Sequence, residues 1–223
     1  PVSECFAMQS LFERYRPRTL DDVLGQDKAV KALKRLREKN GFGGRAYWIS
    51  AGSGTGKTTI ARLIARDMAE SWHVEEIDAQ DCNLDFVRQM EVGFAYKGMG
   101  TKQGKAWIIN EAHGLRGPVL SRFLTAIESL PAHCAIVFTT TKQGQDMLFE
   151  EMADASPLLS RCFEVPMTSK GLADKFAERA AEIADKEQLN GKPITWYKRL
   201  AMDCRNNFRA MLSQIETGAA LDS

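Results

Sequence analysis

Short apolar runs alternate with longer amphipathic stretches through most of the chain, a pattern that predicts alternating strands and helices. The strand candidates are residues 46–50, 73–78, 106–110, 134–139 and 161–165. The helix candidates are residues 27–40, 55–70, 82–94 and 115–130. Strands that alternate with helices favour βαβ crossovers and a mainly parallel sheet with helices on both faces. The sequence therefore predicts an α/β fold that ends near residue 168.

The last quarter of the chain has a different pattern, because only helical periodicity follows the linker-like residues 166–171. Leu172, Phe176, Ala180 and Ile183 share one helix face. Further helical faces are supplied by Trp196, Leu200, Phe208, Met211, Leu212 and Ile215. We therefore expect a nucleotide-binding α/β domain at 8–168 and a small all-helical domain at 169–223.

The beginning of the chain carries two further expectations. Residues 1–7 start at Pro1 and precede Met8, so we interpret them as a tag or a processed N-terminus. Pro17 is expected to keep residues 11–20 out of a helix.

Residues 51–58 read Ala-Gly-Ser-Gly-Thr-Gly-Lys-Thr and lie between the first strand of the alternating pattern and the helix that follows. Glycines allow successive backbone N–H groups to point inward, and the new helix presents its positive dipole end to an anion. In such a loop Lys57 reaches the β- and γ-phosphates and the Thr58 hydroxyl can ligate Mg²⁺. The predicted nucleotide-binding residues here are Gly52, Ser53, Gly54, Thr55, Gly56, Lys57, Thr58 and Thr59.

The loop departs from the usual Gly-x-x-x-x-Gly-Lys-[Ser/Thr] pattern at its first position, which is Ala51. A methyl group is tolerable there if the φ angle of that residue is negative. A plain Gly-rich hairpin loop is the alternative, but the flanking strand and helix are the context that a phosphate loop requires. We therefore predict binding of ATP together with Mg²⁺.

A second chemical feature is the buried strand at 106–110, which ends in Asn110 and Glu111. Glu111 is positioned to orient or deprotonate an attacking water. Asn110 stands where an aspartate usually assists Mg²⁺ through water, and a neutral amide accepts the same hydrogen bonds with less electrostatic attraction. Hydrolysis is thus less firmly predicted than binding, and a strand that simply ends at the surface is the alternative.

Two later positions complete the set of candidates. Thr141 follows the strand at 134–139 and can place a hydroxyl near the γ-phosphate, although threonine is also a common strand residue. Arg161, in Ser160-Arg161-Cys162, can reach a neighbouring subunit's nucleotide and stabilise developing phosphoryl charge. Taken alone, such an arginine is usually a solvated surface residue.

Composition adds limits. The 223 residues are 44% apolar and carry a formal net charge of +1, so any contact with nucleic acid has to come from a local basic face. Five scattered cysteines and three histidines show no metal-ligand spacing, so a metal site built from protein ligands alone is not expected. No apolar run approaches the roughly 20 residues that span a bilayer, and no secretory signal is evident. We expect a cytoplasmic protein with reduced thiols.

The order of these motifs resembles the AAA+ ATPases of the sliding-clamp-loader group. The resemblance is carried by 15–17 and 22–26, the phosphate loop, 110–113, 139–141, 160–162 and the stretch Asn-Phe-Arg-Ala-Met-Leu at 207–212. It implies a P-loop parallel sheet followed by a helical lid, with Tyr15, Arg16 and Val23 bordering the adenine. It also implies that Arg209 on the lid senses the γ-phosphate and that Arg161 completes the next protomer's site in an oligomer.

Two segments outside the nucleotide site favour clamp loading over related AAA+ proteins. Residues 81–88 resemble the clamp-loader segment that opens a DNA-tracking helix, and residues 123–131 resemble the Leu-x-x-x-Glu-x-x-Pro stretch. Arg88 is the leading candidate for contact with DNA phosphates, followed by Arg116 and Arg122, and such contacts are independent of base sequence. By spacing alone Arg88 is equally suited to pair with Glu91. The resemblance also implies a helical collar beyond the lid, and since the sequence ends at Ser223 we expect either a truncated chain or a short variant of the family.

These observations predict a subunit that binds ATP, and hydrolyses it, to load a sliding clamp onto primer–template DNA. Its partners would be other clamp-loader subunits or copies of itself, the clamp and the DNA, with no membrane. Asn110 and Ala51 leave open a scaffold subunit that binds ATP without hydrolysing it. A recombination-associated AAA+ remodeller of forks or junctions is the third hypothesis.

Overall fold

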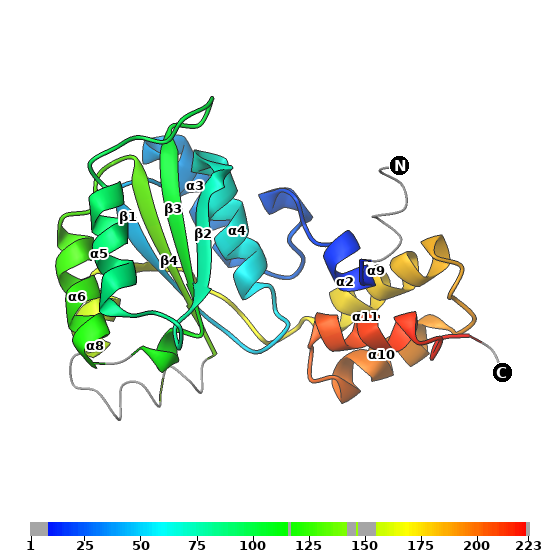
Figure 1. Cartoon of the computed structure of the whole chain (residues 1–223). Coiled ribbons are helices and arrows are strands. Elements are labelled where there is room, and N and C mark those ends of the chain that lie inside the picture. The colour runs from blue at the N-terminus through cyan, green and yellow to red at the C-terminus, as the bar shows by residue number, and fades with distance from the viewer. Residues whose placement is uncertain (1–8, 116, 142–145, 147–154, 222–223) are drawn as a thin grey trace. The chain divides into compact units, whose positions relative to one another are not determined.

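The computed structural model describes residues 9–115, 117–141, 146 and 155–221. Its centre is a five-stranded sheet with the strand order β2-β3-β4-β1-β5 (Figure 1). The strands are β1 (Arg45–Ser50), β2 (Ala69–Asp78), β3 (Gly104–Asn110), β4 (Cys134–Thr140) and β5 (Cys162–Glu164). Every neighbouring pair of these strands is parallel, which confirms the predicted α/β fold.

Helices cover both faces of the sheet, as parallel strands with crossover connections require. Figure 1 shows α3 and α4 on one side and α5, α6 and α8 on the other. The bounds are α3 (Asp27–Asn40), α4 (Lys57–Met68), α5 (Leu84–Gly93), the 3₁₀ turn η2 (Ala112–Gly114), α6 (Gly117–Glu128) and α8 (Ala155–Ser160). Within the described residues, no helix combines the length and the apolarity needed for a bilayer crossing.

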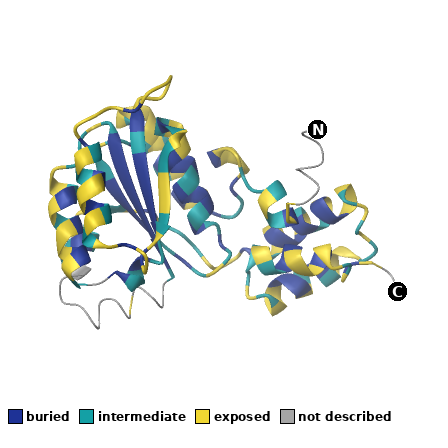
Figure 2. Cartoon of the chain, in the orientation of Figure 1, coloured by how far each residue is buried: buried dark blue, intermediate teal, exposed yellow. Residues whose placement is uncertain are grey.

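The interior strands are buried on both faces, whereas β2 lies at an edge of the sheet (Figure 2). All seven residues of β4 are buried, and β1 is buried from Ala46 to Ile49. One apolar core lies between the sheet and helices α5, α6 and α8 and contains Trp48, Phe123 and Phe138. This is the core that the apolar runs of the sequence predict.

Several element boundaries differ from the sequence prediction, and two of these differences have local reasons. Helix α4 begins at Lys57 instead of residue 55, because Gly56 has a φ of +101° and cannot continue a right-handed helix backwards. Strand β2 begins at Ala69 instead of residue 73, and its pairing with β3 shifts register between Ala69 and Val74. Residues 69–72 therefore belong to β2, although their sequence lacks the alternation of apolar and polar residues that is typical of a strand.

The C-terminal residues form the helices that their pattern predicts. These are α9 (Ala173–Lys186), α10 (Ile194–Asp203) and α11 (Phe208–Glu216). They share an apolar core that includes Phe176, Tyr197 and Met211. Leu11 belongs to the same core and comes from α2 (Leu11–Arg14), a single helical turn followed by the 3₁₀ turn η1 (Leu20–Asp22). The expectation that Pro17 excludes a helix from 11–20 was therefore wrong for the first four residues, which end before the restriction imposed by Pro17 begins.

The chain divides into two compact units. The sheet unit comprises Lys28–Ala51 and Lys57–Met167. The helical unit comprises residues 9–27, the loop tip Gly52–Gly56 and residues 168–221. The division into functional domains at 8–168 and 169–223 stays a prediction, and residues 1–7 lie outside the described residues.

Candidate nucleotide-binding site

The phosphate-loop sequence adopts a conformation that depends on its glycines. Gly54 and Gly56 have φ angles of +69° and +101°. A Cβ added to Gly54 would lie 1.9 Å from Asn207 Oδ1, so this position has no room for a side chain. Ala51, by contrast, is not among the four non-glycine residues of the described chain that have positive φ. The methyl group at the first loop position is therefore accommodated without backbone strain.

The tip of this loop is held within the helical unit. Thr55 Oγ1 donates to Gly52 O at 2.8 Å, and Gly54 O accepts from Phe208 N at 3.3 Å. Asn207 caps α11 by accepting from Ala210 N at 3.1 Å. The start of the helix that carries Arg209 thus lies against the loop tip.

Lys57 is the first residue of α4 and belongs to the sheet unit. It is only 8% exposed, and its Nζ donates to Ala51 O at 3.2 Å across the base of the loop. Thr58 follows in the first helical turn and is half-buried, while Thr59 is buried. An ammonium and a hydroxyl at the start of a helix whose N–H groups lack intrahelical partners are well suited to bind an anion.

The carboxyl end of β3 brings Asn110 and Glu111 to the same edge of the sheet as the start of α4, because that helix follows the carboxyl end of parallel strand β1. Glu111 has φ 49° and ψ 49°, a left-handed conformation that costs a non-glycine residue about 1–3 kcal/mol. Its Oε2 is buried, has no hydrogen-bond partner within the described residues, and lies 3.4 Å from His113 Nδ1. Backbone strain and an unsatisfied carboxylate oxygen are both typical of functional positions.

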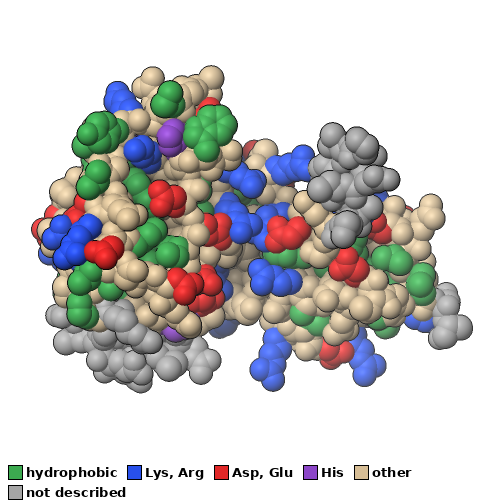
Figure 3. All heavy atoms as spheres, viewed as in Figure 1, with side chains coloured by type: hydrophobic (Ala, Val, Ile, Leu, Met, Phe, Trp, Pro, Cys, Tyr) green, Lys and Arg blue, Asp and Glu red, His purple; other side chains and the backbone are tan. Residues whose placement is uncertain are grey.

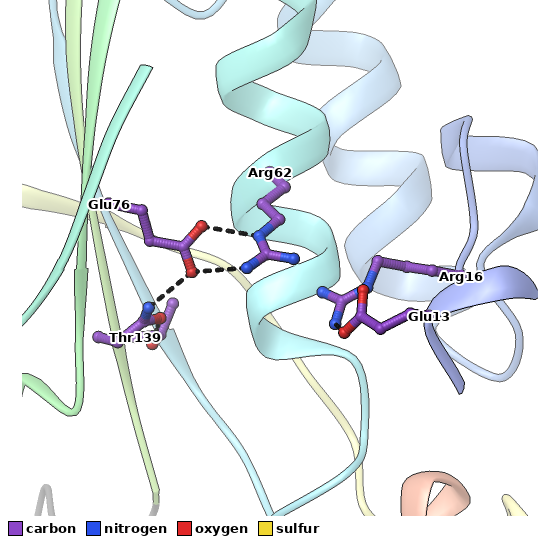
Figure 4. A network of polar contacts seen from close by, with 6 residues as sticks. Glu13, Arg16, Arg62, Glu76 and Thr139 are labelled. Atoms are coloured by element: carbon purple, nitrogen blue, oxygen red, sulfur yellow. Dashed lines mark hydrogen bonds and ion pairs between the residues drawn. The ribbon is translucent and has the colours of Figure 1, made fainter. Parts of the chain in front are cut away.

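Asn110 is part of a hydrogen-bond network that joins the four elements β2, β3, β4 and α4 (Figure 4). Its Nδ2 donates to Glu76 Oε1 at 2.8 Å, and its Oδ1 accepts from Thr139 Oγ1 at 2.9 Å. Glu76 in turn accepts from Arg62 Nε at 2.7 Å and from Arg62 Nη2 at 3.1 Å. Figure 4 shows Arg62 on α4 and Glu76 on β2 pointing toward each other. The sequence did not point to Glu76 or Arg62, because no motif links them to Asn110.

The three threonines at the end of β4 have different surroundings. Thr139 and Thr140 are buried, and the hydroxyl of Thr139 is committed to Asn110. Thr140 Oγ1 lies 3.1 Å from His113 Nδ1. Thr141 follows the last residue of β4 and is half-buried. Its assignment as a γ-phosphate sensor stays a prediction.

The residues expected to border the adenine lie in the helical unit together with Arg209. The guanidinium carbons of Arg16 and Arg209 lie 4.8 and 4.6 Å from the centroid of the Phe12 ring, within the range of cation–π interactions. Tyr15 donates its hydroxyl to Glu187 Oε1 at 2.6 Å, and this hydrogen bond raises the pKa of Tyr15 and lowers the pKa of Glu187. Val23 is 9% exposed.

Arg161 lies between α8 and β5 and is exposed. Its Nε and Nη2 contact Glu128 Oε1 at 2.8 and 2.7 Å, and its Nη1 donates to Pro157 O at 3.1 Å. Glu128 is the glutamate of the Leu-x-x-x-Glu-x-x-Pro stretch noted in the sequence. The guanidinium is therefore held at the surface of the sheet unit by a carboxylate.

The arginines predicted to contact DNA pair with acidic residues of helix α5. Arg88 Nη1 donates to Asp85 Oδ1 at 2.8 Å, so its partner is Asp85 and not Glu91. Glu91 instead accepts from Arg122 Nε and Nη2 at 2.9 and 2.5 Å. The side chains of Arg88 and Arg122 remain 63% and 45% exposed. Arg116 lies outside the described residues.

The cysteines that the structure describes are free thiols. Burial raises the pKa of the Cys82 and Cys134 thiols to about 11 and that of Cys162 to about 12. Burial also raises the pKa of Cys204. Within the described part of the chain, no three His, Cys, Asp or Glu residues are grouped so that they could hold a metal ion.

An apolar cluster is exposed on the sheet unit, where Figure 3 shows hydrophobic side chains beside a histidine. Trp72, Tyr96 and Met99 are 68%, 66% and 77% exposed. His73 joins two of them, since its ring lies 6.3 Å from that of Trp72 and its Nε2 accepts from Met99 N at 2.8 Å. Large exposed apolar side chains that gather in this way are typical of protein contact surfaces.

Comparisons with known proteins place this geometry in context. No family model matches the chain. It is 29% identical to the replication factor C small subunit of Haloarcula marismortui over 177 residues, which is 76% of this chain and 51% of the relative. It is 28% identical to DNA polymerase III subunit tau of Bacillus subtilis over 206 residues, 81% of this chain and 34% of the relative. The chain is related to the clamp-loader AAA+ ATPases.

The chain thus spans about half the length of the first of these clamp-loader relatives and about a third of the second. A single-residue variant of RuvB from Thermotoga maritima has the same fold, with a TM-score of 0.68, 20% identity and coverage of 91% of this chain and 64% of that one. At this identity the likeness concerns the fold alone. AAA+ ATPases use a nucleotide and usually Mg²⁺.

Proposed function

We propose that the chain is the ATPase portion of a clamp-loader subunit, which binds and hydrolyses ATP to help place a sliding clamp on primer–template DNA. The observation that supports this most is the glycine-dependent loop that leads into Lys57 and Thr58, at the sheet edge where Asn110 and Glu111 end β3. The names of the relatives support the clamp-loader role. The partners we propose are other clamp-loader subunits or copies of this chain, the clamp and the DNA, all in the cytoplasm.

The residues proposed to hold ATP are those that the sequence predicts. Loop backbone N–H groups and Lys57 would bind the phosphates, while Tyr15, Arg16 and Val23 would border the adenine. Arg209 and Thr141 would sense the γ-phosphate. Gly54 supports the phosphate-binding role of the loop, because its left-handed backbone and the 1.9 Å approach of an added Cβ to Asn207 Oδ1 require glycine there, as in a phosphate loop.

The oxygen donors present fit a magnesium ion that arrives bound to ATP. Mg²⁺ prefers oxygen ligands and keeps several waters beside substrate phosphates. The Thr58 hydroxyl would ligate it, and Asn110 Oδ1, which accepts one hydrogen bond from Thr139, keeps one lone pair for a metal-bound water. When bound, the ion would neutralise charge that develops on the phosphates.

For hydrolysis we propose that Glu111 orients the attacking water and accepts its proton, and that Arg161 stabilises the transition state in a neighbouring protomer. The buried Oε2 of Glu111 supports the first role, since it is an acceptor without a partner in the described residues. The exposure of Arg161 supports the second. Arg161 would have to exchange Glu128 for the phosphates of the neighbour.

DNA contact is proposed for Arg88, with Arg122 and Arg116 as weaker candidates. Arg88 lies on the exposed side of α5, within two turns of the start of the helix. Asn83 caps that start, since its Oδ1 accepts from Phe86 N at 2.8 Å. The apolar stripe of α6 is not available for contact with the clamp, because Val119, Leu120 and Phe123 are buried in the core. The exposed Trp72, Tyr96 and Met99 are the better candidates for this contact.

Phosphate release decides whether the chain hydrolyses ATP. We expect Glu111→Gln to bind ATP as the wild type does and to release phosphate about 10²–10⁴-fold more slowly, because the amide cannot accept a proton. The measurement is steady-state phosphate release with and without primed DNA. Glu75→Gln, which removes an exposed carboxylate from β2, is the matched control and should turn over normally.

The same assay separates the rival functions. A wild-type chain that binds ATP but releases no phosphate, in the presence of its partners, would support the scaffold subunit instead. Clamp pull-down distinguishes the recombination-associated remodeller, which would act on forks or junctions without a clamp.

If Arg88 contacts DNA phosphates, removing its side chain should make DNA binding less dependent on salt concentration. Arg88→Ala should bind primer–template DNA several-fold more weakly, with the slope of log K against log salt reduced by about 1. Arg179→Ala is the matched control, because Arg179 also pairs with an acidic residue three positions away, Glu182, at 2.9 Å. Equal losses for both variants, measured by fluorescence anisotropy across a salt series, would contradict the assignment.

A further inference from the structure

The side-chain amide of Asn110 forms a hydrogen bond through each of its two polar atoms: Nδ2 is a donor and Oδ1 is an acceptor. Asn110 Nδ2 donates to Glu76 Oε1 at 2.8 Å, while Asn110 Oδ1 accepts from Thr139 Oγ1 at 2.9 Å. Ionised carboxylates only accept hydrogen bonds, whereas an amide both donates and accepts. An aspartate at 110 would therefore face the Glu76 carboxylate at hydrogen-bond distance with no proton between them.

An ion pair with Arg62 fixes the Glu76 carboxylate in the orientation that accepts from Asn110. Arg62 on α4 donates to both of its carboxylate oxygens, at 2.7 and 3.1 Å, and the side chain of Glu76 is 26% exposed. Glu76 pairs with Ile108 in the register of β2 and β3, so Asn110 is its diagonal neighbour. Long side chains at diagonal positions of neighbouring strands reach one another.

The two bonds of Asn110 act on the backbone directly before Glu111. Asn110 is the last residue of β3, and Glu111 adopts the left-handed conformation at the next position. A strained conformation persists only where its surroundings impose it. Bonds from Asn110 to β2 on one side and to β4 on the other hold the strand end from which Glu111 departs.

We propose that Glu76 is a positioning residue for Glu111, acting through Asn110, and that Glu76 is the reason an amide occupies position 110 in this chain. This role rests on the proposed hydrolysis of ATP. Asn110 and Glu76 then form a matched pair, in which Glu76 supplies a carboxylate on the neighbouring strand and Asn110 supplies the amide that donates to it. Either residue can supply the acceptor, provided that the other supplies the donor.

Exchanging the two groups tests this matching. Asn110→Asp alone should lower the midpoint of thermal unfolding by about 5 °C, since repulsion replaces a hydrogen bond near a strand end. It should also lower kcat about 10–100-fold with little change in KM for ATP, because Glu111 loses its orientation and not its substrate. Glu76→Gln alone should be mild, because its amide oxygen can still accept from Asn110 Nδ2 and from Arg62 Nη2, so that only the bond from Arg62 Nε is lost.

The double variant Glu76→Gln/Asn110→Asp should recover both the thermal midpoint and kcat to the level of Glu76→Gln alone. In this variant the amide oxygen at position 76 would accept from Arg62 Nε and the amide nitrogen would donate to the new carboxylate at position 110, which would still accept from Thr139, so that one bond from Arg62 is lost as in Glu76→Gln. The matched control is Glu75→Gln/Asn110→Asp, which removes the same charge from the other face of β2 and should rescue neither property.

The readouts separate the proposal from the function on which it rests. ATP binding measured by calorimetry tests the proposed function, and a wild type without binding or turnover would overturn that function and the positioning role together. Recovery of the thermal midpoint without nucleotide supports the Glu76–Asn110 match independently. Faster turnover in Asn110→Asp alone, or equal rescue by Glu75→Gln, would overturn the proposal.

Discussion

Replacing Lys57 with alanine should abolish ATP binding at concentrations that saturate the wild type. The ammonium is buried at the start of α4 and lies 3.2 Å from Ala51 O at the base of the loop, where it would meet the β- and γ-phosphates. Loss of one partner of a buried, hydrogen-bonded charge pair costs about 2–5 kcal/mol, which is about 30-fold to several thousandfold in affinity. Calorimetric titration with a slowly hydrolysed ATP analogue measures the loss.

A lysine in a similar setting provides the control for this variant. Lys105 also belongs to the sheet unit, and its Nζ donates to a backbone oxygen, Gly93 O, at 3.2 Å. Lys105→Ala removes the same charge and the same kind of bond, so it should bind ATP as the wild type does. Equal affinity of Lys57→Ala and the wild type would refute the phosphate-binding role of the loop.

Arg161→Ala should leave ATP binding intact and lower DNA-stimulated turnover about 10³-fold. An arginine that stabilises phosphoryl charge from a neighbouring subunit contributes about 10³–10⁵-fold to turnover in related chemistry and does not need to hold the ground state. Phosphate release in the assembled complex with primed DNA measures the effect. Arg37→Ala is the control, because it removes another exposed arginine of the sheet unit, paired with Asp67 at 3.6 Å.

Mixing two inactive variants tests whether Arg161 acts in the neighbour's site. Lys57→Ala subunits would lack ATP but keep Arg161, and Arg161→Ala subunits would hold ATP without the arginine. If the arginine acts on the neighbour, a mixture of the two should recover part of the turnover that neither has alone. If it acts within its own chain, or if Arg161→Ala turns over normally, the trans-acting role is wrong.

The layered core could be predicted because its signal is local. The apolar runs that became β1, β3 and β4 are nearly continuous, as expected for interior strands of a parallel sheet. The helical face of Phe176, Ala180 and Ile183 is likewise set by spacing and forms the core of the helical unit. The ends of elements were less predictable. The start of β2, for example, depends on a register shift against β3 that cannot be recognised from the sequence of β2.

The candidate site was predictable where a motif carries it and unpredictable where partners come from distant positions. The loop residues and Glu111 follow from spacing alone. By contrast, Glu76 meets Asn110 across 34 residues, and Arg161 meets Glu128 across 33. Only the folded sheet brings these side chains together, and the alternative pairing of Arg88 with Glu91 that spacing left open is replaced by a pairing with Asp85.

The reactivity of the cysteine thiols can be used to follow local unfolding of the chain. Cys82 and Cys134 lie in the apolar core of the sheet unit, Cys162 packs against that core, and Cys204 packs against the core of the helical unit. Alkylating reagents attack the thiolate, so the two fully buried thiols, Cys82 and Cys134, whose pKa is raised by burial, should react only when their surroundings unfold locally. The modification rates of Cys82 and Cys134 therefore record how often the sheet unit unfolds locally, without any introduced label.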